Sequence, residues 1–316
     1  MLGARSGRQT TLAAQAAISG IGVHSGREVS LTIHPAEADN GITFLRTNVY
    51  DDGSDCEIPA DFRYVSATDL CTTVAVDGAE VATIEHLMAT FGALGVDNAV
   101  VELDGPEIPV MDGSAADFIT AVDQVGIAAL GQPRHFLKVL KPVRVELGGA
   151  FAEFRPYDRM RIEVEIDFTS PVIGRQRYAA NVDADSFRRD LARARTFGFL
   201  ADVERLWSRG LALGASLENA VVIGDDRVIN PEGLRFDDEF VRHKALDAIG
   251  DLALVGAPIL GCYRSYRGGH KLNVAALNAL TADQTAWQIV TAPVHREVRH
   301  GELKRAAVAA FGPDAS

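Results

Sequence analysis

The chain of 316 residues is 47% hydrophobic and 23% charged, which is typical of a soluble globular protein long enough for two domains. Its 31 Lys and Arg residues against 43 Asp and Glu residues give a net charge of −12. That balance argues against a nucleic-acid partner and against binding to anionic membranes, and leaves open a local basic pocket for phosphates.

The three cysteines, at positions 56, 71 and 262, are an odd number without paired short spacing. They exclude a disulfide scaffold and a cysteine zinc finger, and they fit a reducing compartment. Residues 1–20 have no sustained apolar core, and no apolar run is long enough for a membrane span, so we predict neither a signal peptide nor a transmembrane helix. We expect a cytoplasmic protein with no stable membrane insertion.

The first half of the chain predicts strands followed by helices. Alternating or β-branched stretches between turn residues indicate strands at 28–35, 41–49, 71–81 and 98–105. Apolar residues at helical spacing indicate helices at 83–98, with Thr83 as N-cap, and at 115–130. Segment 131–136, which holds Gly and Pro between two periodic stretches, is the predicted linker.

The second half begins again with strands, which we predict at 137–147, 150–157 and 160–168. We expect helices at 183–200, 203–210 and 240–256, and a hairpin arm at 219–230. Both halves therefore have an α+β order rather than an alternating βαβ order. Each half also places a His near the start of a helix, which suggests a duplicated unit with a site between the copies.

The helix predicted at 240–256 aligns His243, Asp247 and Asp251, each four residues after the last. At about 100° per residue they lie opposite a stripe of apolar side chains. Imidazole and carboxylate ligands at i and i+4 can reach one divalent metal ion from the same side of a helix. The alternative is an ordinary solvated helix face, but such faces usually carry Lys and Glu.

Two further histidines are candidates for chemistry. Because adjacent helical residues point about 100° apart, His86 could bind a metal while Glu85 reaches a water on it; Glu85 could instead merely favour the helix N-terminus. His270 follows Arg267 and two glycines, a pattern that suits either a phosphate contact or a simple turn. We interpret the other histidines as structural or surface residues: His24, His34, His135, His295 and His300.

Eight segments in order resemble the UDP-3-O-acyl-N-acetylglucosamine deacetylase family, zinc enzymes of the committed step of lipid A synthesis in Gram-negative bacteria. The resemblance runs from about residue 8 to residue 300 and is carried by GIGVHSG, TIEHLMA, DNAVVEL, PEIPVMDGSA, RARTFGF, RGLALGAS, EGLRFDDEFVRHKALDAIGDL and GGH. It implies two similar two-layer α/β-sandwich domains with the active site between them. The second domain is expected to contain an insert that forms an apolar passage for the acyl chain.

On this basis we place a first domain at 1–130, the linker at 131–136, a second domain at 137–305 and a tail at 306–316. The resemblance further implies that Zn²⁺ is bound by His86, His243 and Asp247.

The remaining site residues are also implied by the resemblance. Glu85 corresponds to the general base, His270 to its partner histidine, Asp251 to the carboxylate that orients this histidine, and Thr196 to the hydroxyl near the developing oxyanion. The substrate-contacting residues are expected to be Lys244, Arg267, Phe197 and Cys71. We expect Phe199, Leu211 and Leu213 near the acyl passage, although Leu211 and Leu213 could equally be core residues.

Two positions depart from the family pattern. Arg267 stands where the family has a diphosphate-contacting lysine, which keeps the charge and adds bidentate reach, and Ala150 stands where we expect a substrate-side lysine. Neither change touches the expected metal ligands.

The activity implied is hydrolysis of the N-acetyl group of an acylated UDP-N-acetylglucosamine by a monomer. The alternatives are a zinc deacetylase of the same fold that acts on another N-acyl sugar, and an inactive sugar-nucleotide-binding protein that retains zinc. An inactive protein would be expected to have lost Glu85 or His270, and this chain keeps both.

Overall fold

The computed structural model describes residues 7–291. The first half of the chain forms a five-stranded sheet. The strand order is β2 (Ala16–Ile21), β3 (Glu28–Pro35), β9 (Ala99–Leu103), β4 (Ile42–Arg46) and β5 (Cys56–Pro59). Only the β4–β9 pair is parallel. Helices α1 (Glu85–Leu94) and α2 (Ala116–Val125) come directly before and after β9 in the chain.

The second half repeats this arrangement in its own sheet. Five of its strands follow the order β12 (Val143–Leu147), β13 (Ala150–Arg155), β18 (Ile259–Tyr266), β14 (Met160–Asp167) and β15 (Arg175–Asn181), and only β14–β18 is parallel among these. Helices α5 (Glu239–Ala253) and α6 (His270–Ala282) come directly before and after β18. Two more strands, β11 (His135–Val139) and β19 (Trp287–Thr291), extend the sheet past β18.

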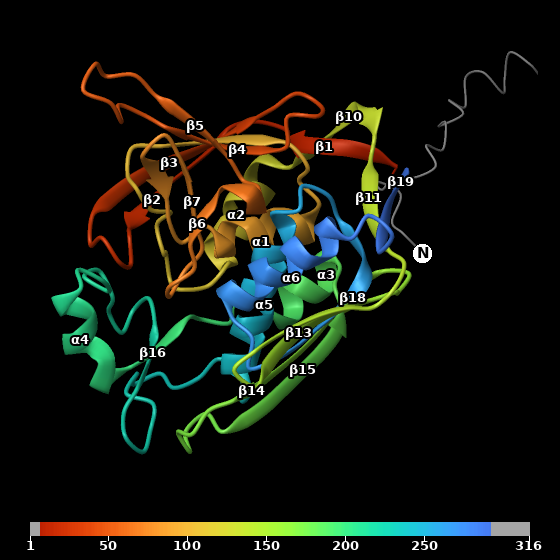
Figure 1. Ribbon diagram of the computed structural model, residues 1–316. Helices are drawn as coiled ribbons and strands as arrows, with labels where there is room; N and C mark the ends of the chain where they lie inside the picture. The colour runs from red at the N-terminus through yellow and green to blue at the C-terminus, as the bar shows by residue number, and fades with distance from the viewer. Residues whose placement is uncertain (1–6, 292–316) are drawn as a thin grey trace, which may run out of the picture.

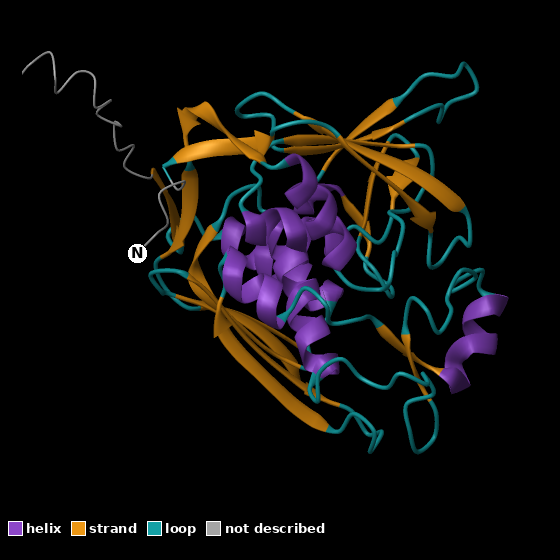
Figure 2. Ribbon diagram, turned by 180° about the vertical axis from the view of Figure 1, so that it is seen from behind, coloured by secondary structure: helices purple, strands orange, loops and turns teal. Residues whose placement is uncertain are grey.

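Strand order, strand direction and helix placement thus agree between the two halves, which confirms the predicted α+β class with two similar units. Helices α1, α2, α5 and α6 lie together in the middle of the molecule, with a sheet outside them on either side (Figures 1 and 2). Their contact is closest between α1 and α5. A continuous set of buried apolar side chains, including Phe44, Phe91, Phe154 and Phe240, joins the two units.

Each unit also has elements without a counterpart. The first contains η1 (Phe62–Tyr64) and a small sheet of β6 (Val65–Ala67), β7 (Thr73–Val76) and β8 (Ala79–Val81) between β5 and α1. The second contains an insert between β15 and α5, composed of α3 (Ala184–Asp190), β16 (Phe197–Phe199), η2 (Leu200–Asp202), α4 (Val203–Ser208) and β17 (Val221–Ile223). Figure 1 shows α4 and β16 standing out from the main body.

The domain boundaries stay a prediction. The connection is short, because β10 (Ile127–Pro133), which pairs with β1 (Arg8–Leu12), is separated from β11 by Arg134 alone. Segment 131–136 is therefore largely strand rather than loop. The tail at 306–316 lies outside the described residues, as do His295 and His300.

Four predicted elements are wrong in part. The strand expected at 71–81 divides into β7 and β8, which pair with each other. The helix expected at 115–130 ends at Val125, because Gly126 at φ 80° leaves the helical conformation and a strand follows. Of the helix expected at 183–200, only Ala184–Asp190 is helical, and Phe197–Phe199 form a strand instead. The strand expected at 137–147 divides into β11 and β12.

The first helix begins at Glu85, and Thr83 is not its N-cap. Thr83 has a left-handed backbone, and Ile84 occupies the cap position without a side-chain hydrogen bond. Among residues 7–291, no helix combines the length and apolarity that crossing a membrane requires.

Candidate metal and catalytic centre

The helices α1 and α5 bring His86, His243 and Asp247 together at the junction of the two units. One ligand atom from each lies within 4.8 Å of the others. The three residues are 3%, 3% and 2% exposed, respectively. The solvated-face alternative for α5 is therefore wrong, and the i, i+4 pair on this helix faces a third candidate ligand from the other half of the chain.

Two glycines allow these helices to approach so closely. A Cβ atom at Gly250 of α5 would lie 2.0 Å from the carbonyl oxygen of Glu85 on α1. Farther along the contact, a Cβ atom at Gly92 would lie 3.3 Å from the Cβ of Ala253. A side chain at position 250 would consequently push α1 and its histidine away from the ligands on α5.

The polar atoms of this cluster suit a cation. His243 directs Nδ1 to the carbonyl oxygen of Ala194 at 3.0 Å, which leaves Nε2 free, 3.2 Å from Oδ1 of Asp247. Nε2 of His86 lies 3.7 Å from the same oxygen. Oδ1 of Asp247 is buried and has no hydrogen-bond partner among residues 7–291, whereas its Oδ2 accepts a hydrogen bond from Lys244 Nζ at 2.5 Å. An unpartnered carboxylate oxygen facing two imidazole nitrogens is the arrangement that a metal ion would satisfy.

The protonation states agree with this reading. Burial, helped by the neighbouring His243, lowers the pKa of His86 to about 3. Burial also lowers the pKa of His243. Although burial opposes it, the surrounding basic groups hold the pKa of Asp247 below its ordinary value. Neutral imidazoles and an ionised carboxylate are the forms that bind a metal.

Glu85 is a buried carboxylate beside this cluster. It is 3% exposed, and its Oε2 accepts a hydrogen bond from the backbone N–H of Thr72 at 3.1 Å. Its Oε1 lies 3.8 Å from Nε2 of His270. Burial, with a contribution from Asp247 and Asp251, raises the pKa of Glu85 to about 7 against the opposing effect of His270. A carboxylate with such a pKa can exchange a proton near neutral pH.

His270, at the start of α6, pairs with Asp251 on α5. Its Nδ1 lies 2.9 Å from Oδ2 of Asp251, and the same oxygen accepts a hydrogen bond from Asn273 Nδ2 at 2.7 Å. The other oxygen of Asp251, Oδ1, accepts a hydrogen bond from Thr72 Oγ1 at 2.6 Å. Burial lowers the pKa of His270, but the carboxylates of Asp251 and Glu85 outweigh it and raise the pKa to about 9. His270 is therefore a cation at neutral pH, and Asp251 fixes its orientation.

Thr196 is positioned by a buried ion pair. Arg195, 1% exposed, donates from its backbone N and its Nε to Oε1 of Glu239 at 3.0 and 2.9 Å, at the first residue of α5. The backbone N–H of Thr196 donates to Gly113 of the first unit at 2.8 Å. The residue is thus tied to both units next to the cluster.

A cavity of about 420 Å³ opens beside these groups. Of the predicted residues it is lined by Cys71, Glu85, His86, Thr196, Phe197, His243, Lys244, Asp247 and His270. Asp251 lies behind His270, and neither Arg267 nor Ala150 lines the cavity. The insert contributes Phe197 and Phe199, whereas Leu211 and Leu213 are not among the lining residues and Leu213 is 53% exposed.

The lining residues that were not predicted from the sequence as parts of the site include His24, Phe168, Arg205 and Leu206. His24, which we interpreted from the sequence as structural or surface, lines the cavity, because the loop that carries it forms one wall. Its place between glycines in GIGVHSG was the available signal. Phe168 packs edge-on against Phe197 at 5.8 Å between ring centroids, and no local pattern marks it.

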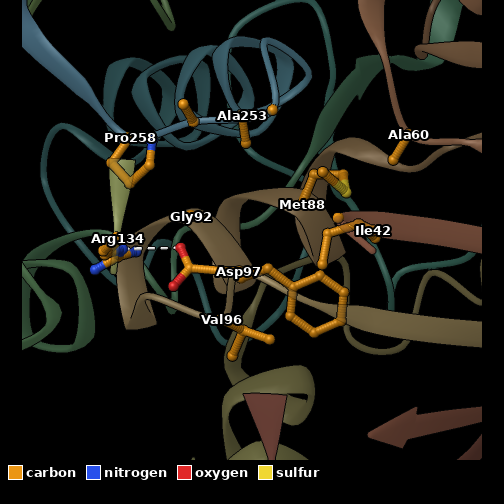
Figure 3. Close-up of a pocket in the computed structure, with 13 residues that line it drawn as sticks. Ile42, Ala60, Met88, Gly92, Val96, Asp97, Arg134, Ala253 and Pro258 are labelled. Atoms are coloured by element: carbon orange, nitrogen blue, oxygen red, sulfur yellow. Dashed lines mark hydrogen bonds and ion pairs between the residues drawn. The ribbon is translucent and has the colours of Figure 1, made fainter. Parts of the chain in front are cut away.

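A smaller cavity of about 70 Å³ lies at the other end of α1 (Figure 3). It is lined mainly by apolar side chains such as Met88 and Val96, with Asp97 and Arg134 at its edge, joined at 2.8 Å. None of the predicted site residues contributes to it.

The family model for UDP-3-O-acyl N-acetylglycosamine deacetylase matches residues 9–282. The chain is also similar to proteins named UDP-3-O-acyl-N-acetylglucosamine deacetylase from Brucella ovis, Brucella canis and Brucella melitensis biotype 2. In each case the identity is 54% over 285 residues, which cover 90% of this chain and 99% of the relative.

Proposed function

The chain belongs to the UDP-3-O-acyl N-acetylglycosamine deacetylase family, and from this we propose that it hydrolyses the N-acetyl group of UDP-3-O-acyl-N-acetylglucosamine. The products are acetate and the free 2-amino sugar nucleotide, and the reaction is the committed step of lipid A synthesis. The observation that carries the proposal is the placement of Glu85 and His270 in one cavity with the cluster of His86, His243 and Asp247.

We propose Zn²⁺ as the cofactor, bound by His86, His243 and Asp247. Two neutral imidazoles and one carboxylate form a donor set typical of catalytic zinc, which keeps one position open. Bound there, the ion would supply Lewis-acid polarisation of the acetamide carbonyl and would lower the pKa of a water. The hydrogen bond from His243 Nδ1 to Ala194 orients the ligand, as outer partners of metal-bound histidines usually do.

Glu85 is the general base of the proposed reaction. With a pKa of about 7, it accepts the proton of the water that attacks the acetamide carbon. Its hydrogen bond with Thr72 keeps the carboxylate directed into the cavity.

His270 and Thr196 act on the charge that develops at the sugar amide. The Thr196 hydroxyl donates to the oxyanion of the tetrahedral intermediate, and cationic His270 stabilises this charge and protonates the departing amine, with Glu85 as the alternative proton source. Lys244 contacts the substrate inside the cavity, and Cys71 lies against it at the cavity wall. Arg267, which precedes the lining residue Gly268 but does not itself line the cavity, contacts the diphosphate outside it.

The acyl chain occupies the apolar part of the cavity. Phe168 packs there against both Phe197 and Phe199, with ring centroids 5.8 and 6.1 Å apart, respectively. Burial of an apolar chain against such side chains stabilises the complex by about 25 cal/mol per Å². We further propose a cytoplasmic monomer. The three buried cysteines, which form no disulfide within the part of the chain that the structure describes, agree with a reducing compartment.

Acetate release from the acylated UDP-sugar tests the proposal. Glu85→Ala should lose activity by a factor of about 10² to 10⁴ while its zinc content equals that of the wild type. Unchanged turnover would remove Glu85 from the chemistry. A zinc-loaded wild type that releases no acetate from this substrate would point to another N-acyl sugar or to an inactive binding protein.

A further inference from the structure

Glu107 is a buried carboxylate that the proposed reaction does not use. It is 2% exposed and accepts three hydrogen bonds. Its Oε1 accepts from the backbone N–H of His24 at 2.9 Å and from Thr83 Oγ1 at 3.0 Å, and its Oε2 accepts from the backbone N–H of Ser25 at 2.8 Å. One side chain therefore joins two segments that are far apart in the sequence.

The first of these segments leads into α1. Thr83 has φ +57°, a left-handed conformation that a β-branched residue rarely adopts and that the surroundings must enforce. It is 4% exposed and lies two residues before Glu85. The preceding residue, Ala82, is paired with the segment of Glu107 by backbone hydrogen bonds to Pro106 and from Ile108 at 2.9 and 3.0 Å.

The second segment is the loop 22–26, which forms a wall of the large cavity. Its carbonyl groups at Val23 and His24 accept hydrogen bonds from Gly214 and Leu213 of the insert, both at 3.1 Å. The loop fits closely over the carboxylate, since a Cβ atom at Gly22 would lie 2.3 Å from Oε2 of Glu107. The loop thereby connects Glu107 to the insert.

We propose that Glu107 is a positioning residue that holds Thr83 in its strained conformation and fixes the loop 22–26 at the same time. Through Thr83 it sets the direction of the first turn of α1, which carries Glu85 and His86. Through the loop it sets the wall of the acyl passage against the insert. The assignment of the passage rests on the proposed function, whereas the link to the metal cluster does not.

The three donors around position 107 require a side chain with two acceptor oxygens. An amide at position 107 would retain one acceptor and direct its NH₂ group toward an N–H of the loop, so that a buried donor would lose its partner. Where the NH₂ group takes the place of Oε1, the hydroxyl of Thr83 loses its acceptor as well, and only the backbone pairing of Ala82 then opposes the strain at Thr83. We expect the segment 82–84 to relax and to carry Glu85 and His86 away from α5.

The test compares Glu107→Gln with Asp97→Asn. Asp97 is a matched control because it also accepts three hydrogen bonds, from Thr10 N, Thr10 Oγ1 and Arg134 Nε, at the opposite end of α1 (Figure 3). For both variants the measurements are Tm, Zn²⁺ affinity by competition with a chelator, and kcat and KM for the acylated UDP-sugar. Glu107→Gln should weaken Zn²⁺ binding by about tenfold or more, as loss of an outer partner of a metal site does, lower kcat and raise KM. Asp97→Asn should lower Tm alone.

If Glu107→Gln lowers Tm but keeps wild-type metal affinity, kcat and KM, the proposal is overturned and Glu107 is a structural residue. If this variant does not fold, Thr83→Val removes only the hydroxyl donor at the same link, and wild-type values in it would equally overturn the proposal. Because metal affinity is measured without substrate, a wild type that fails to deacetylate the sugar nucleotide would refute the proposed function and leave this inference standing.

Discussion

The two halves of the molecule have the same strand order, the same strand directions and the same helix placement, but they carry different parts of the site. The first half supplies Glu85 and His86 from α1, and its second helix, α2, contributes no cavity residue. The second half supplies His243 and Asp247 from α5 and His270 from α6. Neither half alone holds three candidate ligands together with a base and its partner.

This division shows what the duplicated fold provides. Because α1 and α5 are equivalent elements that meet at the junction of the units, their side chains converge without any special loop. The functional difference between the halves lies in the residues on the shared helices and in the insert between β15 and α5. The proposed chemistry would therefore depend on how closely the equivalent helices approach.

The largest effect should follow from removing one ligand on either side of the junction. His86→Ala and His243→Ala lie on different halves, yet both should lose bound metal and acetate release to the same degree, because each removes one of three ligands. Zinc content and turnover measure this. If one of the two variants retains metal and activity, the cluster is not a single shared site.

A smaller but still large effect should come from the helix contact itself. Gly250→Ala places a Cβ atom 2.0 Å from the backbone of Glu85, so we expect a loss of about 3 kcal/mol in the free energy of unfolding and weaker metal binding. Gly92→Ala is the matched control, because its Cβ atom would meet only the Cβ of Ala253, at 3.3 Å. Denaturant unfolding and metal titration check both variants. Equal behaviour of the two would show that the close approach at Gly250 does not position the ligands.

The smallest effect concerns His270, the first residue of α6, which has no histidine counterpart at the start of α2. Asp251 and Glu85 raise the pKa of His270 to about 9 against the effect of burial, so His270 is a cation below that pH and loses its proton as the pH rises through it. Asp251→Asn should move the alkaline loss of kcat to lower pH. If the pKa returns to its ordinary value, the cationic fraction at about pH 8 falls roughly 30-fold. An unchanged alkaline limb would mean that His270 does not act as a cation.

The same pair contributes to stability with a defined sign. Because the pKa of His270 in the folded protein is raised from 6.5 to about 9, the interaction stabilises the fold fully below about pH 6.5 and is lost as the pH rises through about 9.

The periodic parts of the site could be predicted from the sequence. His243, Asp247 and Asp251 share a helix, so their alignment follows from 3.6 residues per turn, and the structure confirms that helix. The roles of the individual residues stay predictions. The burial of the stripe could not be foreseen from the helix alone, because it depends on α1 and α6, which pack against it from distant parts of the chain.

The missed features arise from contacts between distant segments. Thr83 resembles an N-cap locally, but its hydroxyl is used by Glu107, 24 residues away, and its backbone is left-handed. Residues 127–130 continue the apolar pattern of α2, but β1 at the other end of the unit pairs with them and a strand forms. In both cases tertiary hydrogen bonds override local preference.

The separation of His86 and Asp247 along the chain has a thermodynamic consequence. An ion shared by these residues would act as a reversible cross-link that closes a loop of about half of the 316-residue polypeptide, and the unfolded chain would have no preformed site for it. Occupancy would then raise the free energy of unfolding by about 4 kcal/mol at a free ion concentration a thousand times Kd. The lifetime of the folded protein would in this way follow the supply of metal in its surroundings.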